Sequence, residues 1–332
     1  MSTKDATQNV SPRVVNQRLL GYIERGETEK VAQAGSEYTR TQIREEGFAF
    51  QIIPAEQATN DMLDRDLDER LRIIEELEPD SPGAKWVPFQ SIPDGEYITG
   101  SRYQVPFARV LTRKYVKDID ELRTYNQDIR KILSDASIKD ALAEIDGKFI
   151  TTCDAITNNH GGDGVNLFTG KIQYLGLSGG LTKDNWVEAK KLLPRGTQTG
   201  NAAGMPAGKF RLRNHIALMN DTTAQDFQKL DSDEIGDENV GRMYNGGLYQ
   251  DSPYGVKIAF TIKDDLVPEN VVYFFAAPEF LGKAYYLTDW TMFMKKEAFF
   301  IEWFSYWLGG FAIGNVAGVC KVDFDAAVGS AS

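Results

Sequence analysis

Residues 121–156 read ELRTYNQDIRKILSDASIKDALAEIDGKFITTCDAI, and this stretch decides the architecture of the chain. Its apolar side chains recur mostly at gaps of three, four or seven residues, which is typical of one buried helix face. Asp118 and Glu121 form a D-x-x-E start that is close to a capping box. We therefore predict one helix over 118–157, roughly 60 Å long at ~1.5 Å per residue, with Gly147 as its weakest point.

The segment before this helix has the character of an extended ribbon. Residues 85–116 read KWVPFQSIPDGEYITGSRYQVPFARVLTRKYV, and Pro93-Asp94-Gly95 is a strong turn signal between two extended runs. Prolines at this density place the strands at the edge of a sheet. Because an isolated two-stranded ribbon is marginally stable in water, we expect this one to rest on a partner surface.

Two further segments precede the ribbon. Leu63, Leu67, Leu71 and Ile74 recur at helical spacing among acidic residues, which predicts an amphipathic helix over 61–77. Residues 1–47 are polar and carry few apolar side chains, so this arm cannot bury enough surface to fold alone.

The C-terminal half mixes helices and strands, and the chain as a whole is predicted to be α+β. The elements expected before residue 285 are helices at 183–193 (capped by Thr182) and 222–230, strands at 211–219, 255–262 and 271–276, and a Gly-rich loop at 195–209. Residues 285–324 are extended and aromatic: 15 of the 37 aromatic residues lie between Tyr273 and Phe311. Both faces of 299–308 are apolar, which predicts a strand covered on both sides.

Composition excludes several classes of protein. With 42% hydrophobic and 26% charged residues, the 332-residue chain can bury a core. Its net charge of −11 (37 basic against 48 acidic residues) argues against gripping nucleic acid through a basic surface. The two cysteines, Cys153 and Cys320, rule out a disulfide-rich scaffold, and we expect both to be buried. The N-terminus lacks the apolar run of a secretory signal, and the uncharged run 303–320 is too rich in glycine for a membrane span, so no membrane is expected.

The sequence contains no convincing catalytic, cofactor or metal site. Gly208-Lys209 partly matches the phosphate-loop motif. However, Ala203 stands where that motif needs glycine, and Phe210 stands where it needs Ser or Thr. His160 sits in a glycine loop beside Asp163 with no recognisable nucleophile, and His215 falls in a predicted strand. We therefore expect a protein that is not an enzyme and that uses no cofactor.

The order of these segments resembles that of the major capsid proteins of tailed bacteriophages, the Hong Kong 97-type fold. The likeness covers about residues 37–325. It is carried by the helix stretch quoted above and by KAYYLTDWTMFMKKEAFFIEWFSYWLGGFAIGNVAGVCKVDF at 283–324, with its G-x-A-I-x-N turn. The resemblance implies these divisions: an N-terminal arm (1–60), a helix at the loop base (61–77), an extended β-loop (78–112), a peripheral domain with the spine helix (113–164), an axial domain (165–284), and peripheral return strands with the C-terminus (285–332).

The same resemblance implies a structural function. Many copies, as pentamers and hexamers, would assemble in the host cytoplasm into an icosahedral virion shell that encloses double-stranded DNA without sequence-specific binding. Portal, scaffold and decoration proteins are further implied partners. The β-loop would contact a neighbouring subunit, and the residues expected to anchor it are aromatic: Trp86, Phe89, Tyr97, Tyr103 and Phe107. Some members of the family join a loop Lys to an Asn; Lys85 and Asn315 occupy loosely similar places, and we expect no cross-link here.

Three alternatives remain open at this point. A nanocompartment (encapsulin-like) shell would have the same fold and would enclose enzymes instead of a genome. A soluble hydrolase would use an Asp/Glu pair within 165–285 and would need a concave pocket holding those carboxylates. Another virion part, such as a tail or decoration protein, is the third.

Overall fold

The computed structural model describes most of the chain beyond residue 46. The described ranges are 47–64, 71–77, 101–124, 129–161, 164–167, 170–196, 212–229 and 256–325, with single residues at 18, 21, 22, 25, 27, 32, 86 and 89. Most of the predicted arm, the turn at 93–95 and the Gly-rich loop beyond residue 196 lie outside the described residues.

The first sheet is built on a long antiparallel hairpin. Strands β10 (Gly282–Glu297) and β11 (Phe300–Ile313) pair along most of their length. Strand β1 (Ala55–Gln57) adds to β10 in parallel, and β4 (Ala108–Leu111) and β5 (Tyr115–Asp118) both pair with β11. The predicted extended C-terminal segment is therefore confirmed as strands.

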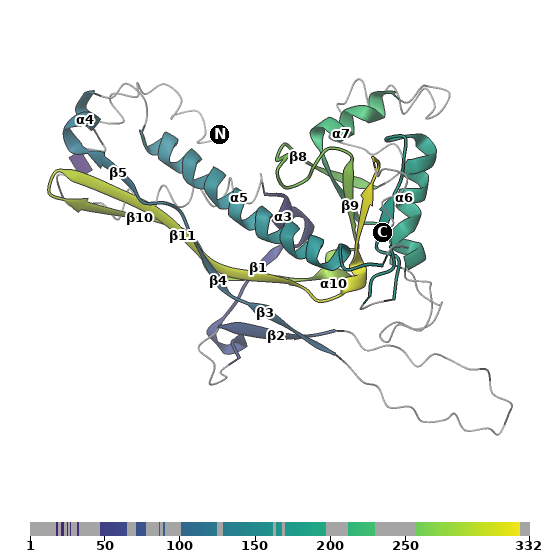
Figure 1. Ribbon diagram of the computed structural model, residues 1–332. Coiled ribbons are helices and arrows are strands. Elements are labelled where there is room, and N and C mark those ends of the chain that lie inside the picture. Colours follow the sequence, from purple (N-terminus) through teal and green to yellow (C-terminus); the bar gives the residue numbers. More distant parts are fainter. Residues whose placement is uncertain are drawn as a thin grey trace, which may run out of the picture.

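The long helix α5 (Ile129–Thr157) lies along one face of this hairpin (Figure 1). It passes through Gly147 without a break. The prediction that this helix begins at Asp118 is wrong. Asp118 ends β5, and its carboxylate accepts a hydrogen bond from Asp120 N at 2.8 Å. A separate short helix, α4 (Ile119–Thr124), follows, and residues 125–128 are not described. The capping signal therefore starts a short helix rather than the long one.

The second sheet is covered on both faces, and its central strands are accordingly apolar throughout. Its strand order is β6 (Tyr174–Gly176), β12 (Val319–Asp323), β9 (Val271–Phe275), β7 (Ile216–Asn220), β8 (Lys257–Thr261). Every residue of β7 and β9 is buried. Side chains alternate between faces in a strand, so Leu218 and Phe275 join the core that contains α5, whereas Met219 and Phe274 pack under helix α6 (Lys183–Gly196).

The remaining short elements connect these layers. They are α3 (Phe48–Ile52), η1 (Asn60–Met62), α7 (Asp221–Gln225), η2 (Asp226–Lys229), α10 (Pro278–Leu281) and η3 (Val316–Gly318). Thr182 caps α6 as predicted, accepting a hydrogen bond from Asn185 N at 3.3 Å.

Strand β12 lies in the second sheet, which corrects the assignment of all of 285–332 to the layer of the long hairpin.

The helix predicted over 61–77 is wrong. Residues 72–76 form strand β2 (Arg72–Glu76), which pairs antiparallel with β3 (Arg102–Pro106) to make the base of the ribbon. Ile73 is buried against Val105 and Tyr285, so pairing and burial outweigh a helical spacing that only four leucine and isoleucine side chains supported. The ribbon thus begins about six residues before the predicted boundary at 78.

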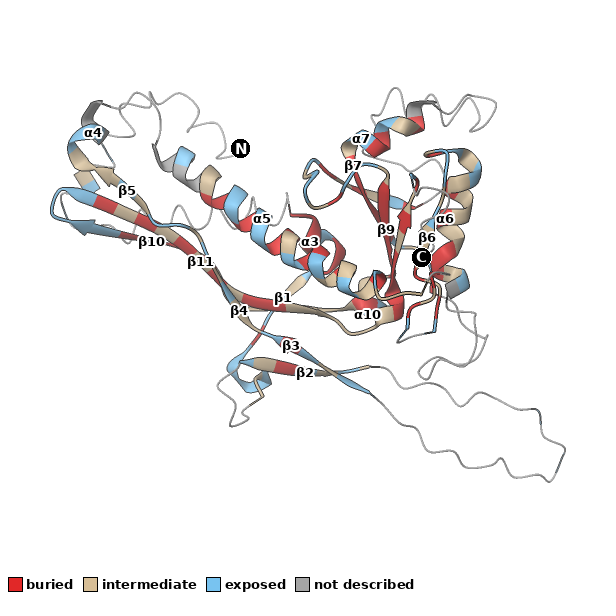
Figure 2. Ribbon diagram, viewed as in Figure 1, coloured by how far each residue is buried: buried red, intermediate tan, exposed pale blue. Residues whose placement is uncertain are grey.

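The core follows α5. Figure 2 shows buried residues along the side of the helix that faces the hairpin and through the centre of the second sheet. The buried residues of α5 recur at helical spacing: Ile138, Ala141, Leu142, Ile145, Phe149, Ile150 and Cys153. Cys153 and Cys320 are both buried, as predicted, and neither forms a disulfide in the described part of the chain. Among the helices that the structure describes, none combines the length and apolar character needed to cross a membrane.

Candidate interaction surfaces

The residues considered for chemistry do not form a site. His160 stacks on Tyr174 with ring centroids 4.4 Å apart, and its Nδ1 lies 2.7 Å from the carbonyl oxygen of Gly161. His215 is exposed and directly precedes β7, and its backbone N–H bonds to Phe275 O at 2.9 Å. Within the described ranges, no group of three or more His, Cys, Asp or Glu is arranged to hold a metal ion.

Lys85 and Asn315, the pair considered for a cross-link that was not expected to form, have no described geometry relative to each other. Lys85 lies outside the described residues. Asn315 is half-buried and caps η3, because its side-chain oxygen accepts a hydrogen bond from Ala317 N at 3.1 Å. Its backbone N–H bonds to Leu281 O at 3.0 Å, so this residue has a structural role at the end of the long hairpin.

The predicted ribbon anchors divide into two groups. Trp86 and Phe89 are fully exposed, at 104% and 96% of their reference areas. Tyr103 and Phe107 instead pack, half-buried, against the cluster of Ala58, Ile73, Val105 and Tyr285 in their own chain. Tyr97 is not among the described residues. Contact with a neighbouring copy stays a prediction. Of the five aromatic residues, Trp86 and Phe89 are the two whose exposed side chains best suit such a contact.

The base of the ribbon is firmly held. The hydroxyl of Tyr285 donates to Glu75 Oε1 at 2.6 Å, and Arg72 pairs with Asp64 at 2.8 Å. Tyr103 packs so closely on Gly314 that a Cβ added there would lie 2.5 Å from its ring. Burial, and then the nearby Glu75 carboxylate, raise the pKa of Tyr103 to about 12, so this phenol stays neutral at physiological pH. These contacts hold the base of the ribbon to the first sheet.

The long helix α5 is bonded to the second sheet through Asp154. Asp154, near the end of that helix, accepts hydrogen bonds from Tyr273 Oη and from Lys321 Nζ, each at 2.8 Å. Tyr273 belongs to β9 and Lys321 to β12. Burial and the Asp154 carboxylate raise the pKa of Tyr273, so it remains the donor. These contacts join the long helix to the second sheet.

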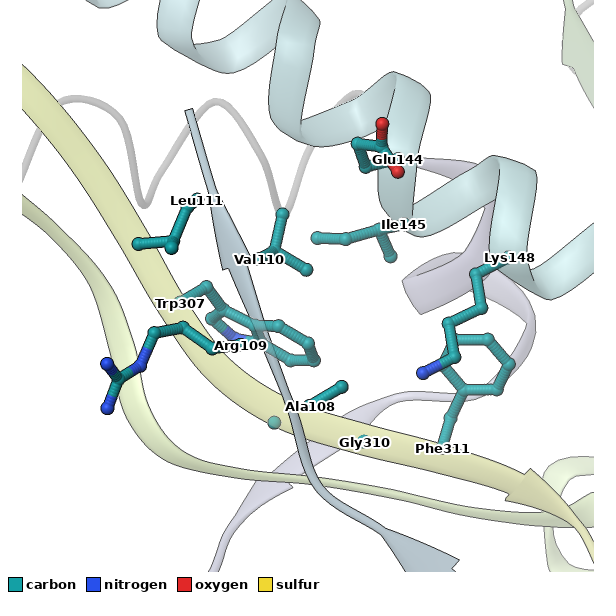
Figure 3. Close-up of a pocket in the computed structure, with 11 residues that line it drawn as sticks. Ala108, Arg109, Val110, Leu111, Glu144, Ile145, Lys148, Trp307, Gly310 and Phe311 are labelled. Atoms are coloured by element: carbon teal, nitrogen blue, oxygen red, sulfur yellow. The ribbon is translucent and has the colours of Figure 1, made fainter. Parts of the chain in front are cut away.

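A groove opens where α5 crosses the edge of the first sheet. It has a volume of about 350 Å³ and is lined by β4, by one turn of α5 and by the middle of β11: Ala108, Arg109, Val110, Leu111, Glu144, Ile145, Lys148, Trp307, Gly309, Gly310 and Phe311. Figure 3 shows Val110 and Ile145 pointing toward each other, whereas Arg109 points away from the helix. Sequence reasoning missed this groove, because its lining comes from three distant segments.

The face of the first sheet that points away from α5, here called the outer face, is rich in apolar side chains. Phe293 and Phe304 are opposite each other in the hairpin, with ring centroids 5.0 Å apart. Phe293, Phe300, Leu111 and Val116 are all exposed. Residues 299–308 were predicted to be covered on both faces; in the described part of the chain the side chains of β11 that face α5 are buried, whereas those on the outer face are half-buried or exposed. The outer face therefore has the character of a contact surface.

Comparison with known proteins supports the fold. No protein-family model matches the chain, and no curated protein matches its sequence. Solved structures do match. A capsid structure of the cyanophage P-SCSP1u is 10% identical with a TM-score of 0.54, covering 77% of this chain and 84% of that one. A structure of Microbacterium phage Oxtober96 is 9% identical with a TM-score of 0.56, covering 84% and 91%.

A third match comes from another phage. A structure of Mycobacterium phage Adephagia is 10% identical with a TM-score of 0.52, covering 85% of this chain and 91% of that one. At such low identities the likeness concerns the fold alone. The chain therefore has the Hong Kong 97-like capsid fold, the fold of tailed-phage capsid structures.

Proposed function

We propose that this chain is the major capsid protein of a tailed phage, and that many copies assemble into an icosahedral shell around double-stranded DNA. The observation that carries the proposal is the match in fold over more than four fifths of the phage chains. In this proposal 113–164 and most of 285–318 form the peripheral domain, and 165–284 with β12 forms the axial domain. The protein has a mechanical role and needs no catalytic site.

The ribbon gives the proposal a physical basis. Trp86 and Phe89 expose nearly all of their apolar surface, which a single chain in water does not favour. Contact with a neighbouring copy would bury both side chains. Each such contact can be weak, because in a closed shell every subunit makes several at once. The net charge of −11 suits a wall that faces densely packed DNA without adhering to it.

Two of the alternatives are less well supported. The three structures compared above come from phages, which favours a shell around a genome over a nanocompartment. A hydrolase would need paired carboxylates in a pocket, and the lining of the groove beside α5 contains one carboxylate, Glu144. Portal, scaffold and decoration proteins, and assembly in a host cytoplasm, belong to the proposal as expected partners and location.

Electron microscopy of the full-length protein tests the proposal. The purified chain is concentrated and imaged in negative stain, with sedimentation velocity on the same sample. Icosahedral particles, or rings of five and six subunits, are the expected result. A monodisperse 37.1 kDa monomer at every concentration would overturn it. Particles that purify with a second protein in fixed ratio would favour the nanocompartment.

A further inference from the structure

Two short segments connect the strands of the first sheet to those of the second. Residues 276–281 lead from β9 to β10, and residues 314–318 lead from β11 to β12. The two segments are bonded to each other, because Asn315 N donates to Leu281 O at 3.0 Å. Figure 1 shows α10, which belongs to the first segment, at the corner where the long hairpin meets the second sheet. These two segments are here called the junction.

The ribbon packs directly on this junction. The ring of Tyr103, in β3, lies against the backbone of Gly314, so that a Cβ added to Gly314 would be 2.5 Å from Tyr103 Cε1. The backbone of Gly282, the first residue of β10, also approaches Gly314: a Cβ added to Gly282 would be 3.0 Å from Gly314 N. Gly314 has no side chain that could rotate away, so a displacement of the Tyr103 ring acts on its backbone.

The other end of segment 314–318 is bonded to the second sheet. Gln173 Nε2 donates to Val316 O at 2.5 Å and to Val319 O at 2.9 Å. Gln173 directly precedes β6 and is 1% exposed, and its backbone oxygen accepts the N–H of Lys321 in β12 at 2.8 Å. One buried amide side chain therefore holds η3 against two strands of the second sheet.

These contacts make a short and closely packed path from the ribbon to the second sheet. Tyr103 touches Gly314, and Val316, two residues further along, bonds to Gln173. All four residues are buried or half-buried. Because packed interiors transmit a displacement more readily than they absorb it, a change in the position of the ribbon alters the hydrogen bonds of η3.

We infer that Tyr103 couples the position of the ribbon to the second sheet through residues 314–318. A contact that displaces the ribbon then changes the stability of the hydrogen bonds around Gln173. A change at Gln173 acts on the ribbon to the same extent, because coupling between two sites is reciprocal. In an assembled shell, contacts of the ribbon and contacts of the second sheet become cooperative. That consequence rests on the proposed function, whereas the coupling within one subunit does not.

Hydrogen exchange in the full-length, unassembled subunit tests the coupling. Peptides covering 171–176 and 102–106 are followed by mass spectrometry at high dilution. Y103A removes the ring from Gly314, and exchange in 171–176 should become ~tenfold faster, within the range usual for coupled sites. Y103F keeps the ring and should exchange like wild type, which separates loss of packing from loss of the hydroxyl. Wild-type exchange in 171–176 of Y103A would overturn the inference.

V105A is the matched control in the same strand. Val105 is fully buried and packs with Ile73 and Tyr285, whereas the atoms nearest to Gly314 belong to Tyr103. V105A should therefore speed exchange in 102–106 and leave 171–176 unchanged. If V105A and Y103A speed exchange in 171–176 equally, the second sheet responds to any loosening of the ribbon, and the inference is wrong.

A double variant tests the path itself. Q173A removes the two side-chain bonds to the junction, and it should also speed exchange in 102–106, because the coupling is reciprocal. If both side chains act through one path, Y103A/Q173A should exchange in 171–176 no faster than Q173A alone. Independent effects would instead multiply, and multiplied fold-changes would contradict the inference. The comparison of Y103A with V105A is decisive even if Q173A does not fold.

The failure of this inference and the failure of the proposed function give different results. A wild-type chain that never assembles would overturn the proposed function. An unassembled Y103A subunit that exchanges like wild type in 171–176 would overturn the coupling, whether or not the wild-type chain forms particles.

Discussion

The carboxylate of Asp146 accepts a hydrogen bond from Lys263 Nζ at 2.6 Å, and it joins three segments that are far apart in the sequence. Asp146 belongs to α5, and Lys263 follows β8 of the second sheet. The same carboxylate accepts the backbone N–H of Ala49 at 3.1 Å, at the start of α3. Asp146 is fully buried, whereas Lys263 retains 27% exposure and lies 5.5 Å from the centroid of the Phe48 ring. Burial raises the pKa of Asp146, although Lys263 acts to lower it.

Replacing Lys263 with methionine should therefore be destabilising and dependent on pH. Loss of one partner from a buried pair leaves a charge without compensation, which costs on the order of 3 kcal/mol. In K263M the pKa of Asp146 rises further above its unfolded value, so the folded state binds its proton more readily. The loss of unfolding free energy caused by K263M should therefore shrink as the pH falls toward the pKa of Asp146, and it should be largest at pH 8.

Urea unfolding of the unassembled subunit at pH 5 and pH 8 measures this. The matched control is K283M, which removes an exposed pair between Lys283 and Glu56, 3.8 Å apart. That change should cost less than ~1 kcal/mol at both pH values. An equal loss at pH 5 and pH 8 in K263M would show that the carboxylate does not control the effect.

Removing the end of the ribbon should separate folding from assembly. Leu77 N donates to Ser101 O at 2.8 Å, and the pairing register places these two residues opposite each other. Residues 78–100 can therefore be replaced by Asn-Gly, a two-residue turn that suits such a pair. Strands β2 and β3, with the cluster around Ile73, remain intact.

This variant should show an unchanged circular dichroism spectrum and a melting temperature within a few degrees of wild type, yet form no shells in the electron microscope. W86A/F89A, which keeps the full ribbon, is the companion variant and should assemble poorly. Normal particles from the shortened chain would be evidence against a role for the ribbon.

Gly147 is a position where the helix can be strengthened. It lies in the middle of α5, and an added Cβ would be 3.6 Å from Leu266 Cδ2, an ordinary contact. Replacing a mid-helix glycine with alanine stabilises by roughly 0.5–1 kcal/mol, because the unfolded chain loses freedom. G147A should raise the midpoint of urea unfolding; a lower midpoint would mean that the helix needs flexibility there.

Gly310 in β11 should respond in the opposite direction. A Cβ at this position would lie 2.0 Å from the carbonyl oxygen of Pro106, where the ribbon leaves the first sheet. Backbone atoms cannot move aside easily, so G310A should be destabilising by ~1–3 kcal/mol. The same urea titration, run beside G147A, measures it. An unchanged midpoint would show that the crossing of β3 over β11 is looser than its geometry indicates.

Much of the fold could be predicted where the sequence pattern was long and repeated. The helix around Ile145 and Phe149 and the strands of 282–313 carry many apolar positions at one period, so single exceptions do not matter. The strand at 72–76 was mistaken for a helix, because the evidence there came from four side chains. Its pairing with β3 lies about 30 residues away and leaves no local signal.

The candidate surfaces were predictable only in part. The aromatic content of the ribbon pointed to Trp86 and Phe89, and both are exposed. Nothing in the composition distinguished them from Tyr103 and Phe107, which pack inside their own chain. The groove beside β4 could not be foreseen, since Val110, Ile145 and Trp307 are far apart in the sequence.

By itself, the sequence determined the long helix, the aromatic hairpin and the central buried strands, because periodic burial of apolar side chains is a local property of the chain. Only the tertiary structure decided which aromatic side chains remain exposed, where Asp146 meets Lys263, and which strand has an open edge. Those features depend on contacts between residues more than 100 positions apart or on pairing across a sheet, and both are set by packing rather than by neighbouring residues.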